Sequence, residues 1–208
     1  MKEIIPSLLT TNLAEYRTKV EIIKGLVKKV HLDVMDGRFV PNTTTPLPDI
    51  KKIKTNFDFQ AHLMVYYPEK YIKKLRKLRV KEIIFHAETT KKYDSLVKIC
   101  HANKIKAGLA INPNTPVSKI AKYLKKIDFL LVMTVYPGFS GQKMIPRCLS
   151  KIKAAKEISR KLIVGVDGGV NEKNILKVKK AGADFVCAES AIFKGNAKEN
   201  LAKLRKLF

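Results

Sequence analysis

A histidine, an aspartate and a methionine alternate along one predicted strand near the start of the chain. Residues 30–35 read Val-His-Leu-Asp-Val-Met, and successive side chains of a strand point to opposite faces. His31, Asp33 and Met35 therefore share one face, whereas the other face is entirely aliphatic. A half-exposed strand with a polar outer face would show the same alternation. A second copy of the pattern favours a site for metal binding or proton transfer.

That second copy is the stretch 59–64, in which His62 and Met64 again share a face. A further carboxylate, Asp167, ends the apolar run 162–166 and precedes two glycines. Two neutral imidazoles and two carboxylates form a nitrogen and oxygen ligand set suited to a divalent transition ion, and no cysteine is needed. The sequence thus predicts a metal site with the ligands His31, Asp33, His62 and Asp167.

Eight short apolar runs alternate with helix-like segments along the chain, as in a parallel sheet covered on both faces. The predicted strands are 3–6, 30–35, 59–64, 82–85, 106–110, 128–133, 162–166 and 184–187, and the predicted helices are 13–27, 48–54, 68–78, 93–102, 116–124, 145–158, 172–180 and 197–204. No linker divides residues 1–208, so we expect one domain with the α/β architecture of a single (β/α)8 TIM barrel. A doubly wound open sheet is the rival fold. It is disfavoured because candidate site residues end strands throughout the chain, which suits a ring with one mouth.

In such a barrel the active site lies at the carboxyl ends of the strands. The candidate residues at or near these ends are Ser7, Asp33, Met35, Met64, Met133 and Asp167. Glycine-rich loops follow the sixth and seventh strands, and a short helix beginning at Ser190 follows the eighth. Exposed N–H groups in such loops bind phosphate, and the loops after the last strands of a barrel often form its phosphate-binding site. We therefore expect a phosphate site there, formed by Gly138, Phe139, Ser140, Gly141, Gly168, Gly169 and Ser190.

Composition narrows the class of protein further. The chain has 208 residues, of which 46% are hydrophobic, enough for one sizeable core. Its three cysteines form no Cys-x-x-Cys pair, which favours a reducing cytoplasm. The first ten residues do not resemble a signal peptide, and no apolar run reaches the length of a membrane helix. We expect a cytoplasmic protein without a membrane partner.

The net charge of +24 raises the question of nucleic-acid binding. The lysines recur in evenly spaced pairs on predicted helices, with no single basic block and no recognisable nucleic-acid motif. We therefore expect no nucleic-acid partner. The positive field would instead attract phosphorylated substrates. A non-catalytic basic binding protein stays open as an alternative.

Over nearly its whole length the sequence resembles the ribulose-phosphate 3-epimerase family. The motifs that carry the resemblance are Pro-Ser-Leu at 6–8, HLDVMDGRFVPN at 31–42, His-Leu-Met-Val at 62–65, TVYPGFSGQ at 134–142, Val-Asp-Gly-Gly at 166–169, Ala-Gly-Ala-Asp at 181–184 and Ser-Ala-Ile-Phe at 190–193. The resemblance implies a (β/α)8 barrel that interconverts D-ribulose 5-phosphate and D-xylulose 5-phosphate in the pentose phosphate pathway. It also implies one divalent metal ion at the barrel mouth, for which zinc, iron, manganese and cobalt are all suitable. We expect a homo-oligomer, although the sequence leaves the number of subunits open.

The resemblance assigns roles to the candidate residues. It makes His31, Asp33, His62 and Asp167 the metal ligands, and Asp33 and Asp167 the catalytic acid and base. Ser7 and His62 would contact the substrate, and Met35, Met64 and Met133 would line the reacting carbon. Inversion beside a ketone needs a proton removed from one face and returned to the other, and a metal would stabilise the enediolate.

Two related barrel functions are weighed against this one. D-allulose-6-phosphate 3-epimerase is the nearest alternative, and Gly168-Gly169 leans towards the pentose enzyme. The orotidine decarboxylase and hexulose-phosphate synthase group has an Asp-x-Lys-x-x-Asp motif. Here Met35 stands two residues after Asp33, and no lysine lies between Asp33 and Asp36, which argues against that group.

The sequence departs from the family pattern at several positions. Glu189 stands where the family usually has glycine, and a carboxylate about 8 Å from a phosphate would cost about 2 kcal/mol at an effective dielectric of about 20. We therefore expect Glu189 to turn outward. Tyr136 and Ser140 also differ from the common residues, and the stretch 43–46 lacks the usual glycine before its proline, so sugar preference and affinity stay open. His86 and His101 have no site partner in the sequence and are interpreted as structural or surface residues.

Overall fold

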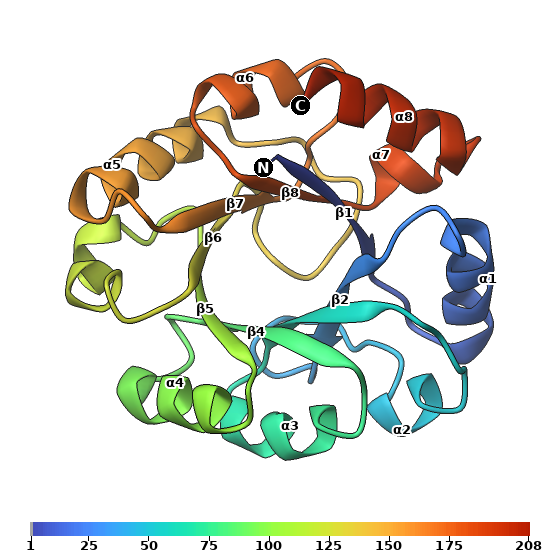
Figure 1. The fold of residues 1–208 in the computed structure, drawn as a ribbon, viewed down its shortest axis with the longest axis horizontal. Coiled ribbons are helices and arrows are strands. Elements are labelled where there is room, and N and C mark those ends of the chain that lie inside the picture. Colours follow the sequence, from blue (N-terminus) through green and yellow to red (C-terminus); the bar gives the residue numbers. More distant parts are fainter. Residues whose placement is uncertain (1) are drawn as a thin grey trace.

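The computed structural model, which describes residues 2–208, is a closed ring of parallel strands surrounded by helices (Figure 1). The strands pair in chain order, and the last pairs with the first. This arrangement confirms the predicted (β/α)8 TIM barrel. The strands are β1 (Glu3–Leu8), β2 (Lys29–Met35), β3 (Asp58–Met64), β4 (Val80–His86), β5 (Lys106–Ile111), β6 (Phe129–Met133), β7 (Ile163–Asp167) and β8 (Phe185–Ala188).

Helical segments cover the outside of the barrel (Figure 1). They are α1 (Leu13–Ile23), α2 (Leu47–Ile50), α3 (Pro68–Leu75), α4 (Tyr93–Ala102), η1 (Val117–Tyr123), η2 (Pro146–Leu149), α5 (Ser150–Ile158), α6 (Ile175–Lys180), α7 (Ser190–Phe193) and α8 (Ala197–Leu207), where η marks a 3₁₀ helix. No helix within residues 2–208 is both long and apolar enough to cross a membrane.

Most predicted elements occur close to their predicted bounds, and the differences have local causes. The helix expected over 13–27 ends at Ile23, because Gly25 has a φ of 77°, which a right-handed helix cannot continue. The segment 116–124 forms the tighter 3₁₀ helix instead of an α-helix. The helix expected over 145–158 is split, with a 3₁₀ turn that starts at Pro146 followed by α5.

The strands separate two apolar layers. The larger layer lies between the strands and the helices and includes Val30, Leu32 and Val34, the aliphatic face of β2. The smaller layer fills the inside of the barrel and includes the rings of Phe129 and Phe185. The interior therefore has an apolar floor, and the polar side chains gather above it.

The register between adjacent strands determines the height of the candidate residues along the barrel axis. Asp33 of β2 is paired with His62 of β3, and Met133 of β6 is paired with Asp167 of β7. Ser7 of β1 lies beside His31 in the same way. Parallel pairing without large offsets thus brings side chains from distant segments to one end of the barrel.

Candidate metal centre and active site

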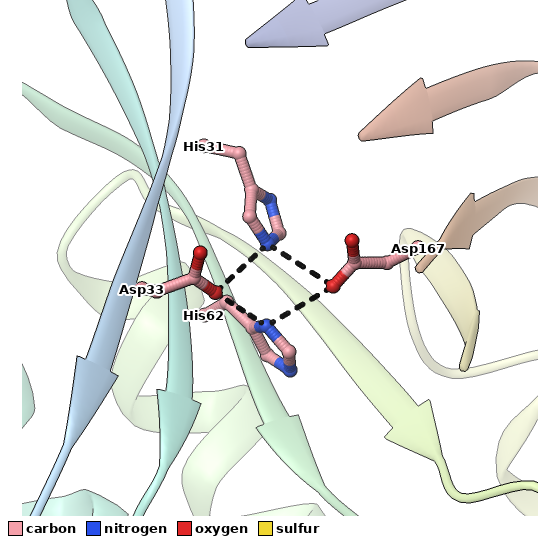
Figure 2. Close-up of side chains that lie close together, drawn as sticks. All are labelled: His31, Asp33, His62 and Asp167. Carbon is pink, nitrogen blue, oxygen red and sulfur yellow. Dashed lines mark hydrogen bonds and ion pairs between the residues drawn. The ribbon is translucent and has the colours of Figure 1, made fainter. Parts of the chain in front are cut away.

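Four side chains converge inside the barrel mouth (Figure 2). They are His31, Asp33, His62 and Asp167, and one potential ligand atom of each lies within 4.8 Å of those of the others. The Nε2 atom of His31 is 3.6 Å from Asp33 Oδ1 and 3.9 Å from Asp167 Oδ2. The Nδ1 atom of His62 is 3.1 Å and 3.7 Å from the same two oxygens. Nitrogen and oxygen atoms therefore alternate around a common centre.

Burial shifts the ionisation of this group. Desolvation lowers the pKa of His31 to about 4 and holds the pKa of His62 well below its usual value. Desolvation raises the pKa of Asp33, and it raises that of Asp167 strongly, with a further contribution from the negative charge of Asp33. Both imidazoles are thus neutral at pH 7, and the carboxylates repel each other. A cation at the centre would offset this repulsion.

The orientation of His31 fits a metal ligand. Its Nδ1 lies 2.7 Å from Oε1 of Gln60, while Nε2 of Gln60 donates to Glu82 at 2.6 Å. Nδ1 of His31 therefore carries the hydrogen, and the lone pair of Nε2 faces the cluster. This buried Nε2 atom has no hydrogen-bond partner among residues 2–208. The donor set and this unpaired nitrogen fit a divalent ion.

A pocket lies directly above the cluster at the carboxyl ends of the strands. Asp33 and Asp167 reach its surface, whereas both histidines are fully buried below it. His62, which was also predicted to contact the substrate, is therefore not part of the pocket lining. The other predicted contact residues all line this pocket: Ser7, Met35, Met64, Met133, Gly138, Phe139, Ser140, Gly141, Gly168, Gly169 and Ser190. The structure therefore brings the predicted site residues together.

The walls of the pocket differ in character. Met35, Met64 and Met133 are at most 5% exposed and form an apolar wall near the two carboxylates. The hydroxyl oxygen of Ser7 is buried and unpaired within the described chain, so it is available to a ligand. Such a pocket excludes water from the acids while it offers a polar contact.

The opposite side of the pocket consists of the loops after β6, β7 and β8. Gly138, Gly141, Gly168 and Gly169 all have positive φ angles. At Gly169 a Cβ atom would lie 2.4 Å from the backbone nitrogen of Met144, so only glycine fits there. Glycine-rich loops with positive φ angles can form concavities of backbone N–H groups, which suit an anion such as phosphate.

The expectation for Glu189 is wrong. Its side chain does not point away into solvent but lines the pocket and is only 18% exposed. Oε1 forms an ion pair with Lys19 Nζ at 2.8 Å, and Oε2 accepts a hydrogen bond from the hydroxyl of Ser140. Lys19, which is on α1, attracts the carboxylate and partly neutralises it beside the expected phosphate site.

Sequence reasoning also missed the surroundings of His86. This residue is fully buried, and its Nε2 atom lies 2.9 Å from Nε2 of His62. It therefore does have a site partner. The sequence pattern that could have indicated this role is His-x-Glu at the carboxyl end of β4, because the carboxyl ends of all strands in a barrel surround the same site. His101, in contrast, is exposed and forms a hydrogen bond with Asp128, as expected of a surface residue.

Comparison with known proteins agrees with this geometry. The model of the ribulose-phosphate 3 epimerase family matches residues 3–193. This chain belongs to that family. The match includes all four cluster residues and the three glycine-rich or short-helix segments after β6, β7 and β8.

Relatives in the ribulose-phosphate 3-epimerase family span nearly the whole chain. The ribulose-phosphate 3-epimerase of Schizosaccharomyces pombe is 35% identical, with 96% of this chain and 90% of the relative covered. Those of Bacillus subtilis and Aquifex aeolicus are 33% and 36% identical, with 99% and 100% of this chain covered and 99% and 96% of the relative.

Among solved structures, 3-hexulose-6-phosphate synthase from Salmonella typhimurium has a TM-score of 0.74 at 16% identity, with 99% of this chain and 97% of that chain covered. At that identity the likeness shows the barrel fold alone.

Proposed function

We propose that this chain interconverts D-ribulose 5-phosphate and D-xylulose 5-phosphate by removing and returning the proton at C3. The observation that carries the proposal is the convergence of His31, Asp33, His62 and Asp167 beneath a pocket whose far side suits phosphate. The named epimerases among the relatives support the same reaction.

Asp33 and Asp167 approach the cluster from opposite sides (Figure 2). One carboxylate would accept the C3 proton, and the other, already protonated, would donate a proton to the opposite face of the same carbon. The two exchange roles in the reverse direction. Burial raises the pKa of both groups and so favours a pair that holds a proton for this transfer.

A divalent ion held by His31, Asp33, His62 and Asp167 would supply Lewis-acid stabilisation of the enediolate oxygens, an effect of several kcal/mol. The ligand set suits zinc, iron, manganese or cobalt. Ser7 would orient the substrate through its free hydroxyl. Met35, Met64 and Met133 would exclude water from the acids.

The loops with Gly138, Phe139, Ser140 and Gly141, with Gly168 and Gly169, and with Ser190 would hold the phosphate of the ketose. We infer one catalytic domain over residues 1–208 that acts on this small molecule alone, without nucleic acid or membrane. Assembly as a homo-oligomer and a cytoplasmic location stay predictions.

The test is incubation of the metal-loaded protein with ribulose 5-phosphate in heavy water. We expect xylulose 5-phosphate to form with deuterium at C3. D-Allulose 6-phosphate serves as the competing substrate, and we expect its kcat/KM to be lower. Product without solvent deuterium at C3 would contradict the proton-transfer mechanism. A higher kcat/KM for allulose 6-phosphate would assign the chain to the hexose phosphate instead.

A further inference from the structure

A line of hydrogen-bonding groups runs from His62 away from the cluster to the outer end of β4. The Nδ1 atom of His62 faces Asp33 at 3.1 Å, and its second nitrogen lies on the far side of the ring (Figure 2). That second nitrogen, Nε2, is 2.9 Å from Nε2 of His86. The Nδ1 atom of His86 is in turn 3.2 Å from Oε2 of Glu88. Both histidines are fully buried, so water does not compete for these nitrogens.

The carboxylate at the end of this line is fixed and ionised. Oε1 of Glu88 accepts hydrogen bonds from the backbone N–H of Asn112 at 2.9 Å and from the hydroxyl of Thr115. Burial alone would raise the pKa of Glu88, but hydrogen bonds from His86, Thr115 and Asn112, together with electrostatic attraction to His86, lower it to about 2. Glu88 therefore acts only as an acceptor.

Because Glu88 can only accept, it determines the donor and the acceptor of each hydrogen bond between His62, His86 and Glu88 when both rings are neutral. Nδ1 of His86 must carry the hydrogen that Glu88 accepts, so Nε2 of His86 has a lone pair. Nε2 of His62 then donates its hydrogen to that lone pair. The remaining nitrogen of His62, Nδ1, presents its lone pair to the cluster.

The other histidine of the cluster has an equivalent arrangement built from different residues. The outer nitrogen of His31 bonds to Gln60, and Gln60 bonds to the carboxylate of Glu82. Two independent lines of hydrogen bonds thus end in carboxylates and turn one nitrogen of each imidazole towards the same centre. This repetition is what a metal site requires of its surrounding residues.

We propose that His86 and Glu88 are positioning residues that fix His62 in the tautomer and orientation needed to bind the divalent ion. The inference rests on the proposed function, because it assumes that the cluster holds a metal. It adds two residues outside the ligand set on which metal affinity depends. Loss of such a partner typically weakens metal binding about 10–100-fold.

The chain itself suggests the variants. In His86→Leu the hydrogen bonds to His62 and Glu88 are lost. In His86→Gln the side-chain oxygen can accept from His62 and the amide can donate to Glu88, as Gln60 does between His31 and Glu82. His101→Gln is the matched control, since His101 is exposed and lies outside this line.

The experiment measures Zn²⁺ affinity of metal-stripped protein by competition with a chelator, without reference to activity. We expect His86→Leu to bind Zn²⁺ about 10–100-fold more weakly than the parent protein. His86→Gln should stay within about threefold, and His101→Gln should be unchanged. A folded His86→Leu protein with parental affinity, or His86→Gln as weak as His86→Leu, would overturn the proposal.

A second measurement covers the case in which His86→Leu does not fold. Histidine ¹⁵N spectra of the Zn²⁺-loaded parent protein should show His62 protonated at Nε2 and His86 protonated at Nδ1. The opposite tautomers would overturn the proposal. Failure of the proposed function looks different, because the parent protein itself would then bind no ion or leave C3 unlabelled.

Discussion

The carboxylates of Asp33 and Asp167 belong to strands β2 and β7, yet their oxygens meet in one buried cluster no more than 4.8 Å across. Neither strand is adjacent to the other in the barrel. The closed ring is therefore what allows two acids to approach one ligand from different sides, and the first prediction follows from that relationship.

Replacement of either acid by asparagine should abolish turnover. Asp33→Asn and Asp167→Asn each remove a proton-transfer group, which alone is worth about 10²–10⁴-fold, and each also removes a charged metal ligand. Turnover of ribulose 5-phosphate and deuterium uptake at C3 measure the effect. Asp58→Asn is the control, because Asp58 pairs with Arg79 at the opposite end of β3. If either cluster variant kept a near-parental rate, that residue would have no acid–base role.

Glu189 and Lys19 should shift KM in opposite directions. Their ion pair places a carboxylate beside the phosphate loops together with the cation that neutralises it. Glu189→Gln removes a negative charge beside the phosphate loops, while Lys19 stays paired with Glu15 at 2.9 Å, and should lower KM for the phosphorylated ketose by up to about tenfold. Lys19→Met leaves the carboxylate uncompensated and should raise KM at least tenfold, as expected for an uncompensated repulsion of about 2 kcal/mol at about 8 Å.

Inhibition by inorganic phosphate should follow the same order in the Glu189 and Lys19 variants, because the effect is on the anion and not on the sugar. Ser140→Ala, which removes the hydroxyl that donates to Glu189 without changing the charge of the site, is the comparison. Shifts of KM in the same direction for Glu189→Gln and Lys19→Met would show that charge at this position does not act on the phosphate.

The stability of the protein at acid pH should depend on Glu88. Its pKa is about 2 in the folded protein against 4.5 for an unperturbed glutamate. A lowered pKa contributes stability that is complete above pH 4.5 and is lost as the pH falls towards 2. The difference corresponds to about 3 kcal/mol in the free energy of unfolding.

Urea denaturation at pH 7, 5, 4 and 3 tests this prediction. Glu88→Gln should be less stable at pH 7, and its free energy of unfolding should fall less steeply below pH 4.5 than that of the parent protein. Parallel pH profiles for the two proteins would mean that the pKa of Glu88 does not change on folding.

The floor of the barrel should not tolerate a methyl group at position 165. A Cβ atom on Gly165 would lie 2.1 Å from the ring of Phe185, which is buried and surrounded by the inner core. Gly165→Ala should therefore lower the free energy of unfolding by about 1–3 kcal/mol, the usual cost of overpacking. The second substitution Phe185→Leu should restore part of this loss. Additive losses in the double variant would contradict steric overlap as the cause.

The fold and the ligand set were predictable because each depends on short-range patterns. The eight apolar runs gave the barrel, and the alternation His31-x-Asp33 gave the shared face of β2. The predicted helix ends were less accurate where a single residue terminates the helix, as Gly25 does after α1.

The missed features depend on contacts between distant elements. His86 meets His62 only because β3 and β4 are adjacent and their inner side chains share the crowded interior. The direction of Glu189 depends on Lys19, which α1 carries to the rim next to β8. No pattern within either segment contains that information.

The most direct test of the central claim is a crystal structure of the metal-loaded protein with anomalous diffraction data at the absorption edge of the ion. We expect one anomalous peak per chain, about 2.0–2.2 Å from Nε2 of His31, Nδ1 of His62 and a carboxylate oxygen each of Asp33 and Asp167. The same protein, stripped of metal, should be inactive and should recover when the ion is returned. An ion bound elsewhere, or full turnover after complete metal removal, would contradict the account.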